Sequence, residues 1–252
     1  MHEKRKNKKY PLLPFSQLVF DITRWAPWVY MFEVRWCWHG QKKELQRIES
    51  AILQVLNHHP IFNMHVDTHG YQSYQSSPAT MKGQYYAVRL WTKGEDVYCR
   101  FRWSRILGDG KSIYIFFENV IRAYRGEELP PDEYLIYLEE QSQIQSSARY
   151  AESKAWLETT FADVQVPVRP LMDRKCLQTI LPMRVGIIKD DYRNLTADIN
   201  RFLQDNMLTL DGFFSLCVAL AIAEYCGTES AALTWAYEGR ETPMEQHIFG
   251  SL

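Results

Sequence analysis

The sequence predicts an α/β protein in which packed helices cover mixed sheets. Residues 41–58 carry apolar side chains at spacings of three and four, the period of an amphipathic helix. Residues 97–103 alternate apolar and polar side chains, the period of a strand with two unlike faces. Helices and strands follow one another without a regular βαβ rhythm or a glycine-rich phosphate loop, so the pattern does not indicate a nucleotide-binding parallel sheet.

The first half of the chain holds most of the predicted strands. The 41–58 helix ends before Pro60, which cannot continue it. A second amphipathic helix ends near Gly126, because glycine commonly follows the last helical turn. In chain order, the predicted elements are a helix at 14–26, a strand at 29–38, the helix at 41–58, strands at 61–66, 85–91 and 97–103, and the helix ending near Gly126.

The second half is predicted to be mainly helical. Helices extend over 132–161, and a proline-containing stretch with little periodicity then indicates a linker between two lobes. The 11 residues from Phe213 to Ala223 include one polar residue, so they predict a buried core helix that is too short to span a bilayer. The other elements predicted here are a strand at 177–188, a helix at 195–206 and a strand at 232–237.

Composition excludes several classes of protein. A net charge of −1 argues against general nucleic-acid binding, and the basic segment 1–9 is predicted to be a solvated, flexible tail. No signal-peptide pattern or membrane span is present, so we expect no membrane partner. The five cysteines contain no C-x-x-C pair and are odd in number, which indicates neither a disulfide framework nor a zinc site. These features are typical of a reducing, cytoplasmic setting.

The most informative stretch is residues 103–112, Trp-Ser-Arg-Ile-Leu-Gly-Asp-Gly-Lys-Ser, which leads from a predicted strand into a predicted helix. Taken alone, Asp109 is placed to cap a helix that begins at Gly110. The stretch also resembles the His-His-x-x-x-Asp-Gly signature of nonribosomal peptide synthetase condensation domains and their CoA-dependent acyltransferase relatives. Asp109 and Gly110 match that signature, whereas Ser104 and Arg105 stand where the two histidines should be.

Other pieces resemble the same family in the same order along the chain. None is specific alone, but their order and spacing support one another. They are Tyr10-Pro11-Leu12 with Pro14 and Ser16-Gln17, then 56–62, Tyr134 to Glu140, Ala155-Trp156-Leu157, Thr209-Leu210, Glu238-Gly239-Arg240, and Ile248-Phe249-Gly250.

The resemblance implies the two-lobed fold of chloramphenicol acetyltransferase, with the second lobe truncated. It covers nearly all of the chain but only about the N-terminal half of a family member. The implied organisation is a tail at 1–9, an N-terminal lobe at 10–163, an interlobe linker at 164–175 and a partial C-terminal lobe at 176–252.

The resemblance also implies chemistry. Family members form an amide bond between an acyl donor and an aminoacyl acceptor, each delivered on the phosphopantetheine arm of a carrier protein. The implied partners are carrier proteins and adjoining synthetase domains, with no cofactor or metal bound by the domain itself. The second histidine lies beside the reacting amine; Arg105 cannot accept its proton, because a guanidinium stays protonated. This copy is therefore expected to be impaired.

For the other signature residues, the resemblance implies that Asp109 pairs with an arginine and holds the loop, and that Gly110 permits the turn into the helix. The resemblance makes Arg240 a candidate for an interlobe or tunnel role. The alternative interpretation is that Arg240 is a surface charge. Arg105 could also stabilise an oxyanion.

Two alternative functions stay open. The chain could be a non-catalytic domain that docks carrier or tailoring proteins, or an acyltransferase to an alcohol acceptor, which would also need the histidine. The adjacent pair His58-His59 is interpreted as helix-end residues, since the rest of the signature does not follow it. His65 and His69 near Asp67 are interpreted as a strand-to-turn segment rather than a metal site.

Overall fold

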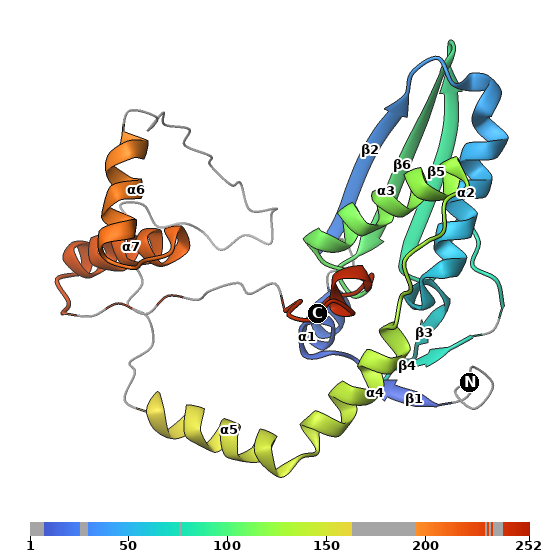
Figure 1. Cartoon of the computed structure of the whole chain (residues 1–252). Coiled ribbons are helices and arrows are strands. Elements are labelled where there is room, and N and C mark those ends of the chain that lie inside the picture. The colour runs from blue at the N-terminus through green and yellow to red at the C-terminus, as the bar shows by residue number, and fades with distance from the viewer. Residues whose placement is uncertain are drawn as a thin grey trace. The chain divides into compact units, whose positions relative to one another are not determined.

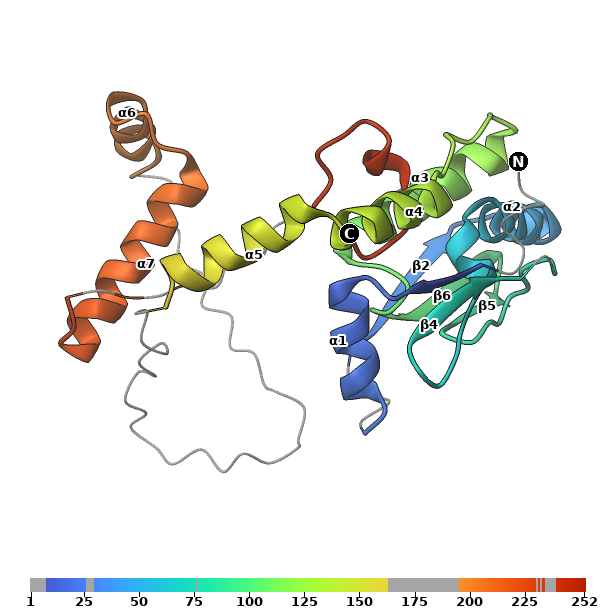
Figure 2. The same cartoon turned by 90° about the horizontal axis from the view of Figure 1, so that it is seen from below.

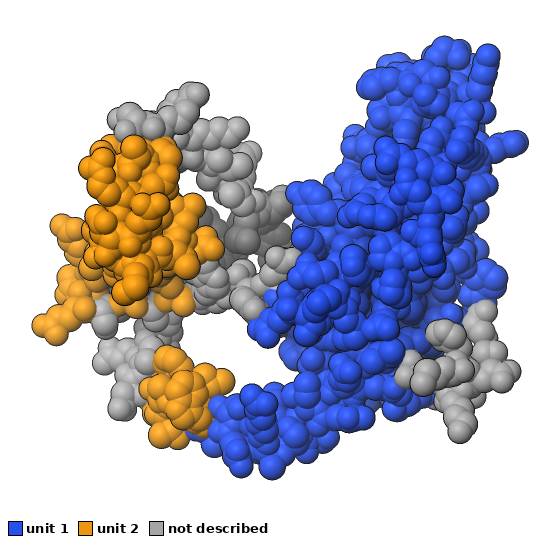
Figure 3. Space-filling view, viewed as in Figure 1, with its two compact units in different colours: residues 1–155, 237–252 blue, residues 156–236 orange. Residues whose placement is uncertain are grey.

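The computed structural model describes residues 8–25, 30–75, 77–162, 195–229, 231, 233 and 239–252. The chain divides into two compact units, residues 1–155 with 237–252 and residues 156–236 (Figure 3). The predicted linker at 164–175 and strand at 177–188 lie outside the described residues, as do most of the 1–9 tail and of the predicted strand at 232–237. The α/β class predicted from the sequence is confirmed.

The first unit contains two three-stranded sheets, and every pairing within them is antiparallel. The larger sheet has the order β2-β6-β5, in which β5 and β6 form a hairpin. The smaller sheet has the order β1-β4-β3. The strands are β1 (Lys9–Pro11), β2 (Met31–Trp38), β3 (Met64–Val66), β4 (Tyr71–Tyr74), β5 (Tyr86–Lys93) and β6 (Asp96–Ser104).

Helices α2 and α3 pack together over one face of the β2-β6-β5 sheet (Figure 1, Figure 2). Their apolar stripes share one core with the sheet, in which the rings of Phe101 and Phe116 stack with centroids 4.4 Å apart. The helices of this unit are α1 (Pro14–Thr23), α2 (Leu45–His58), α3 (Gly110–Arg125) and α4 (Tyr134–Gln145), and α5 (Ala148–Thr160) crosses the boundary between the units.

Strand β6 has the two unlike faces that its sequence predicts. Its inward side chains Val97, Cys99, Phe101 and Trp103 are at most 1% exposed. The side chains between them carry charge or hydroxyl groups, and the outer position Arg102 lies within 3.4 Å of Glu33 on the neighbouring strand β2. The alternation of apolar and polar residues along β6 therefore matches the alternation of its buried and exposed faces.

The strand predicted at 61–66 is wrong in its first half. Pro60–Asn63 form a 3₁₀ turn, η3, and the strand begins only at Met64. The amide of Phe62 donates to the carbonyl oxygen of His59 at 3.2 Å, so the chain turns tightly after Pro60 instead of extending. The short strands β1 and β4 are absent from the sequence prediction.

The last residues pack in the first unit, although the sequence analysis placed them in the second lobe. Ile248 and Phe249 are fully buried in its core, and the rings of Phe249 and Phe62 lie 4.7 Å apart. A 3₁₀ turn, η5 (Glu245–His247), precedes them. The apolar pair contributes to the first core, which explains why residues 239–252 belong to this unit.

The second unit contains α6 (Thr196–Asp205) and α7 (Leu210–Cys226), which confirms the two predicted helices. The hydroxyl of Thr209 caps α7 by accepting from the Gly212 amide at 3.1 Å. The predicted burial of α7 is wrong, because none of its residues is buried and Leu220 is 61% exposed. Because α7 is apolar on every side, its burial would need neighbours all round it, and the ring contact between Phe213 and Phe202 on α6 covers only part of it.

Among the described residues, no single helix is long and apolar enough to cross a membrane. The pair α6 and α7 reaches that length and composition together, but the two helices are bent by 99° at the break between them.

Candidate functional site

The loop of residues 105–109 connects β6 to α3, and backbone hydrogen bonds fix its start. The amide of Ser104 donates to the Tyr85 carbonyl at 2.8 Å, and the amide of Arg105 donates to the Tyr30 carbonyl at 2.9 Å. The Leu107 amide then closes the turn on the Ser104 carbonyl at 3.0 Å. Backbone hydrogen bonds therefore fix Ser104 and Arg105, the two residues that stand in place of the signature histidines.

Ser104 is buried, with 2% of its surface exposed. Its hydroxyl oxygen accepts a hydrogen bond from the Ile106 amide at 3.2 Å, so the side chain helps to hold the turn. A serine nucleophile needs a base within hydrogen-bond reach, and the hydroxyl contact that the structure shows is to a backbone amide. The position of the first histidine thus holds a group that shapes the loop.

Arg105 lies among three aromatic rings. Its guanidinium carbon is 4.6 Å from the ring centroid of Phe15, 5.2 Å from that of Phe32 and 5.9 Å from that of Tyr30. Its Nε is buried and has no hydrogen-bond partner in the described part of the chain. Cation–π attraction, at about 0.5–2 kcal/mol for a ring, therefore holds this side chain in place.

Asp109 caps α3, as its local sequence predicts. Its Oδ1 accepts from the Ser112 amide at 2.9 Å, and the Ser112 hydroxyl accepts from the Asp109 amide at 3.2 Å. This reciprocal arrangement is a capping box, which satisfies two backbone amides at the start of the helix.

Arg240 pairs with the same carboxylate from 131 residues further along the chain. Its Nη1 donates to Asp109 Oδ2 at 2.6 Å, and its Nη2 donates to Asp109 Oδ1 at 3.2 Å. Nη2 also donates to the carbonyl oxygens of Ile248 at 3.3 Å and Gly250 at 2.8 Å. The Arg240 side chain is fully buried, so this charge joins the C-terminal segment to the signature loop.

A buried histidine network lies under this segment. His59 Nδ1 contacts Asp132 Oδ2, and its Nε2 lies 3.0 Å from the Asn119 amide nitrogen. Asp132 Oδ2 also accepts from the Phe249 amide at 3.1 Å. Both ring nitrogens of His59 are therefore engaged.

The neighbouring His58 has a different contact. It lies against the Pro130 carbonyl through Nε2 at 2.6 Å, and burial lowers the pKa of its imidazole below the usual value.

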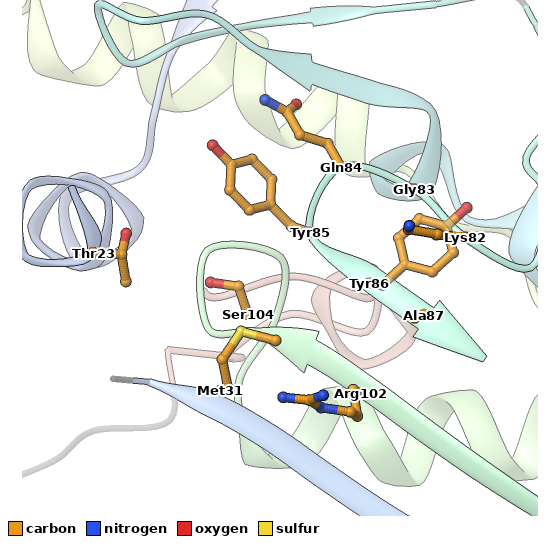
Figure 4. A pocket seen from close by; sticks show the side chains of 10 residues that line it. All are labelled: Thr23, Met31, Lys82, Gly83, Gln84, Tyr85, Tyr86, Ala87, Arg102 and Ser104. Atoms are coloured by element: carbon orange, nitrogen blue, oxygen red, sulfur yellow. The ribbon is translucent and has the colours of Figure 1, made fainter. Parts of the chain in front are cut away.

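A cavity of about 380 Å³ opens beside Ser104 (Figure 4). It lies between the end of α1, which contributes Thr23, the first residue of β2, Met31, and Tyr85, which directly precedes β5. Burial raises the pKa of the Tyr85 hydroxyl above its usual value, so this group remains a neutral hydrogen-bond donor. The cavity has a volume typical of small-molecule sites, which are about 300–1,000 Å³. Its full lining is Thr23, Met31, Lys82, Gly83, Gln84, Tyr85, Tyr86, Ala87, Arg102 and Ser104.

A sequence model of the condensation domain matches residues 72–251, which include this loop, α3 and the Arg240 segment. The chain belongs to the condensation-domain family. Among curated proteins, no sequence matches the chain significantly.

Solved condensation domains share the fold of this chain. The condensation domain of the monacolin K polyketide synthase MokA superposes with a TM-score of 0.75 at 15% identity, over 96% of this chain and 65% of that one. The first condensation domain of the calcium-dependent antibiotic synthetase, solved with a substrate analogue, gives 0.70 at 15% identity, over 97% and 68%. An X-domain solved with OxyB from teicoplanin biosynthesis gives 0.72 at 14% identity, over 86% and 57%.

This condensation domain spans only part of the length of such structures. It covers 49% of the starter condensation domain of the rhizomide synthetase and 65% of the MokA domain. The predicted fold, the two-lobed chloramphenicol-acetyltransferase-like fold, is confirmed by these superpositions.

The structure brings some of the predicted site residues together. Asp109 and Arg240 form one ion pair, while Ser104 and Arg105 start the same loop. Arg240 is neither a surface charge nor exposed, since it is buried in the first unit. Its ion pair with Asp109 lies at the signature loop, and the interlobe or tunnel role implied by the resemblance stays a prediction.

Other residues of the site were missed by the sequence analysis. His59 does end a helix, as interpreted, but its contacts with Asn119 and Asp132 were not foreseen. The partner Ser112 was also missed, although its spacing of three from Asp109 is the sequence signal of a capping box. Asp132 gives no such local signal, because its partner lies 73 residues away.

The glycine that the loop requires for steric reasons is Gly108, not Gly110. A Cβ added at Gly110 would meet no atom within 4 Å, and Gly110 has no left-handed φ. A Cβ at Gly108 would lie 2.7 Å from Phe249 Cε1 and 2.9 Å from Ser112 Cβ. The reason expected for Gly110, freedom to make the turn, is therefore not supported.

We expect Gly108→Ala to lower the free energy of unfolding by about 1–3 kcal/mol, since the added methyl group would overpack a buried contact. Gly110→Ala is the matched control and should be neutral or stabilising by up to about 1 kcal/mol. Urea denaturation followed by tryptophan fluorescence measures both values. Equal effects of the two substitutions would contradict the assignment.

Proposed function

We propose that this condensation-family domain acts in a nonribosomal peptide synthetase system, where it receives groups carried on phosphopantetheine arms but forms amide bonds poorly. On this proposal its remaining role is to dock carrier or tailoring proteins. The observation that carries the proposal is Arg105, which occupies the position of the second signature histidine and is surrounded by three aromatic rings.

The chemical argument concerns the proton of the attacking amine. A neutral imidazole can accept that proton, because its unperturbed pKa is about 6.5. A guanidinium has no free lone pair for a proton and stays charged near neutral pH. Arg105 can donate hydrogen bonds to a developing oxyanion, but that stabilisation leaves the proton without an acceptor.

The other histidines near the core do not replace the missing base. His59 is fully buried, and both of its ring nitrogens already have partners. His58 lies against the Pro130 carbonyl at the end of α2. The sequence contains no histidine between His69 and His247, so the signature stretch itself contains none.

The likeness to solved structures supports a docking role. The MokA domain belongs to a polyketide synthase, and the X-domain was solved as a complex with OxyB. A further relative is the cyclization-docking bidomain of EpoB from Sorangium cellulosum, which this chain matches at 14% identity with a TM-score of 0.56, over 68% of this chain and 42% of that one. The cavity beside Ser104 offers one place where a small group on a carrier arm could bind.

The proposal is tested with the protein that contains the full chain and with donor and acceptor carriers loaded with thioesters. We expect wild type to give little amide product by mass spectrometry. Arg105→His should raise the rate by about 100-fold or more, because a positioned general base contributes roughly 10²–10⁴. Both proteins should bind the loaded carriers with similar affinity, since the substitution changes the base and not the docking surface.

Arg100→His is the matched control. It adds an imidazole to the outer face of the same strand β6, away from the loop, and should leave the rate at the wild-type level. Rapid amide formation by wild type would overturn the proposal that this domain forms amide bonds poorly. Failure of wild type to bind any loaded carrier would overturn the docking role.

A further inference from the structure

The outer face of the β2-β6-β5 sheet carries a group of metal-ligating side chains that the signature chemistry does not use. Cys37, near the end of β2, is directly opposite Tyr98 on β6. Just beyond the last register pair, Trp38 and Val97, the side chains of His39 and Asp96 meet, with Nδ1 3.2 Å from Oδ2. Side chains two residues apart on a strand share one face, so these four groups gather at one end of the sheet.

The ligand atoms converge. Cys37 Sγ lies 3.7 Å from His39 Nδ1, and His39 Nδ1 lies 3.2 Å from Asp96 Oδ2. All three ligand atoms lie within 4.8 Å of one another. In a tetrahedral zinc site, sulfur and nitrogen ligands are about 3.6 Å apart and nitrogen and oxygen ligands about 3.4 Å apart. The observed spacings therefore already approach those of zinc ligands.

The surrounding contacts hold the group in place. The Gly40 amide donates to Asp96 Oδ1 at 2.8 Å, so one carboxylate oxygen is fixed and the other faces His39. Tyr98 is the cross-strand neighbour of Cys37 in the register of β2 with β6. The Lys42 amide donates to the Glu95 carbonyl at 2.9 Å, which ties the segment after β2 to the β5–β6 hairpin.

We propose that Cys37, His39 and Asp96 bind a zinc ion at the end of the β2-β6-β5 sheet. A thiolate, an imidazole and a carboxylate suit zinc, whereas calcium and magnesium prefer oxygen ligands alone. Binding forms a Zn–Sγ bond and releases the thiol proton to solvent. The fourth position faces outward and takes water, since the His39 side chain is 83% exposed.

The bound ion would link two chain segments that are far apart in the sequence. It joins the exit of β2 to the β5–β6 hairpin, which are held together there mainly by exposed polar contacts. A ligand that binds only the folded state raises its stability, so zinc should raise the melting temperature of the protein.

The cysteine pattern alone indicates no zinc site, because the five cysteines contain no C-x-x-C pair and are odd in number. The relevant signal is instead Cys37-x-His39 at the exit of β2 and Asp96-x-Tyr98 at the start of β6. Only the cross-strand register shows that the two pairs face each other.

The test is a titration of the reduced full chain with Co²⁺, followed by displacement with Zn²⁺. We expect a thiolate-to-cobalt charge-transfer band in wild type that zinc removes. Cys37→Ser should abolish this band, and His39→Asn and Asp96→Asn should each weaken binding by more than the roughly 10–100-fold caused by loss of an outer partner. Cys217→Ser, at an exposed cysteine on α7, is the matched control and should bind like wild type.

Melting temperature with and without Zn²⁺ gives a second readout. The increase should be present in wild type and in Cys217→Ser and absent in Cys37→Ser, while circular dichroism checks that each variant is folded. Absence of the charge-transfer band in wild type would overturn the proposal. A band that persists in Cys37→Ser, or one that is lost in Cys217→Ser, would overturn it as well.

Discussion

Replacing Arg240 with methionine is expected to lower the free energy of unfolding of the first unit by about 3–5 kcal/mol. Methionine roughly keeps the volume but removes a buried charge, leaving the Asp109 carboxylate without its ionic partner. The carbonyl oxygens of Ile248 and Gly250 also lose a donor. Urea denaturation followed by near-ultraviolet circular dichroism measures the change.

Two further variants separate this effect from a general loss of charge. Arg125→Ala removes an arginine that is 64% exposed, and it should change the free energy of unfolding by no more than about 0.5 kcal/mol. Arg240→Lys keeps the charge but not the forked donor geometry, so its effect should fall between the two. If Arg240→Met proves as mild as Arg125→Ala, the ion pair does not hold the loop.

The sequence predicts those elements whose burial falls on one face. Helices α2 and α3 and strand β6 each carry one apolar face toward the shared core, and the helical and period-two patterns recorded this. Strands β1 and β4 have three and four residues, so they are too short to show a period. They are held by pairing with each other, which depends on residues far apart in the chain.

The candidate site divides in the same way. The capping role of Asp109 follows from its local sequence, and the departure of Arg105 from the signature is visible in the residues themselves. The identity of the arginine partner is not local, because Arg240 is 131 residues away. The aromatic rings around Arg105 include Phe15 on α1 and Phe32 on β2, both far from Arg105 in the chain. Such contacts need the tertiary fold.

Asp132 explains why the C-terminal segment is bound to the first core. Its side chain is fully buried and accepts from His59, from the Phe249 amide at 3.1 Å and from the Tyr134 amide at 2.9 Å. A buried carboxylate is stable only when its oxygens have such donors. One side chain thus connects the end of α2, the start of α4 and the segment that carries Arg240.

We therefore expect Asp132→Ala to lower the free energy of unfolding by about 3–5 kcal/mol, because it leaves the His59 ring and two backbone amides without an acceptor. Asp132→Asn keeps one acceptor oxygen and should cost less. Glu118→Ala is the control, since this exposed carboxylate pairs with Arg122 on the surface of α3 and should contribute only about 0.3–0.5 kcal/mol. Amide hydrogen exchange at Phe249 gives a local readout: Asp132→Ala should accelerate it and Glu118→Ala should not. Unchanged exchange in Asp132→Ala would show that another contact holds the C-terminal segment.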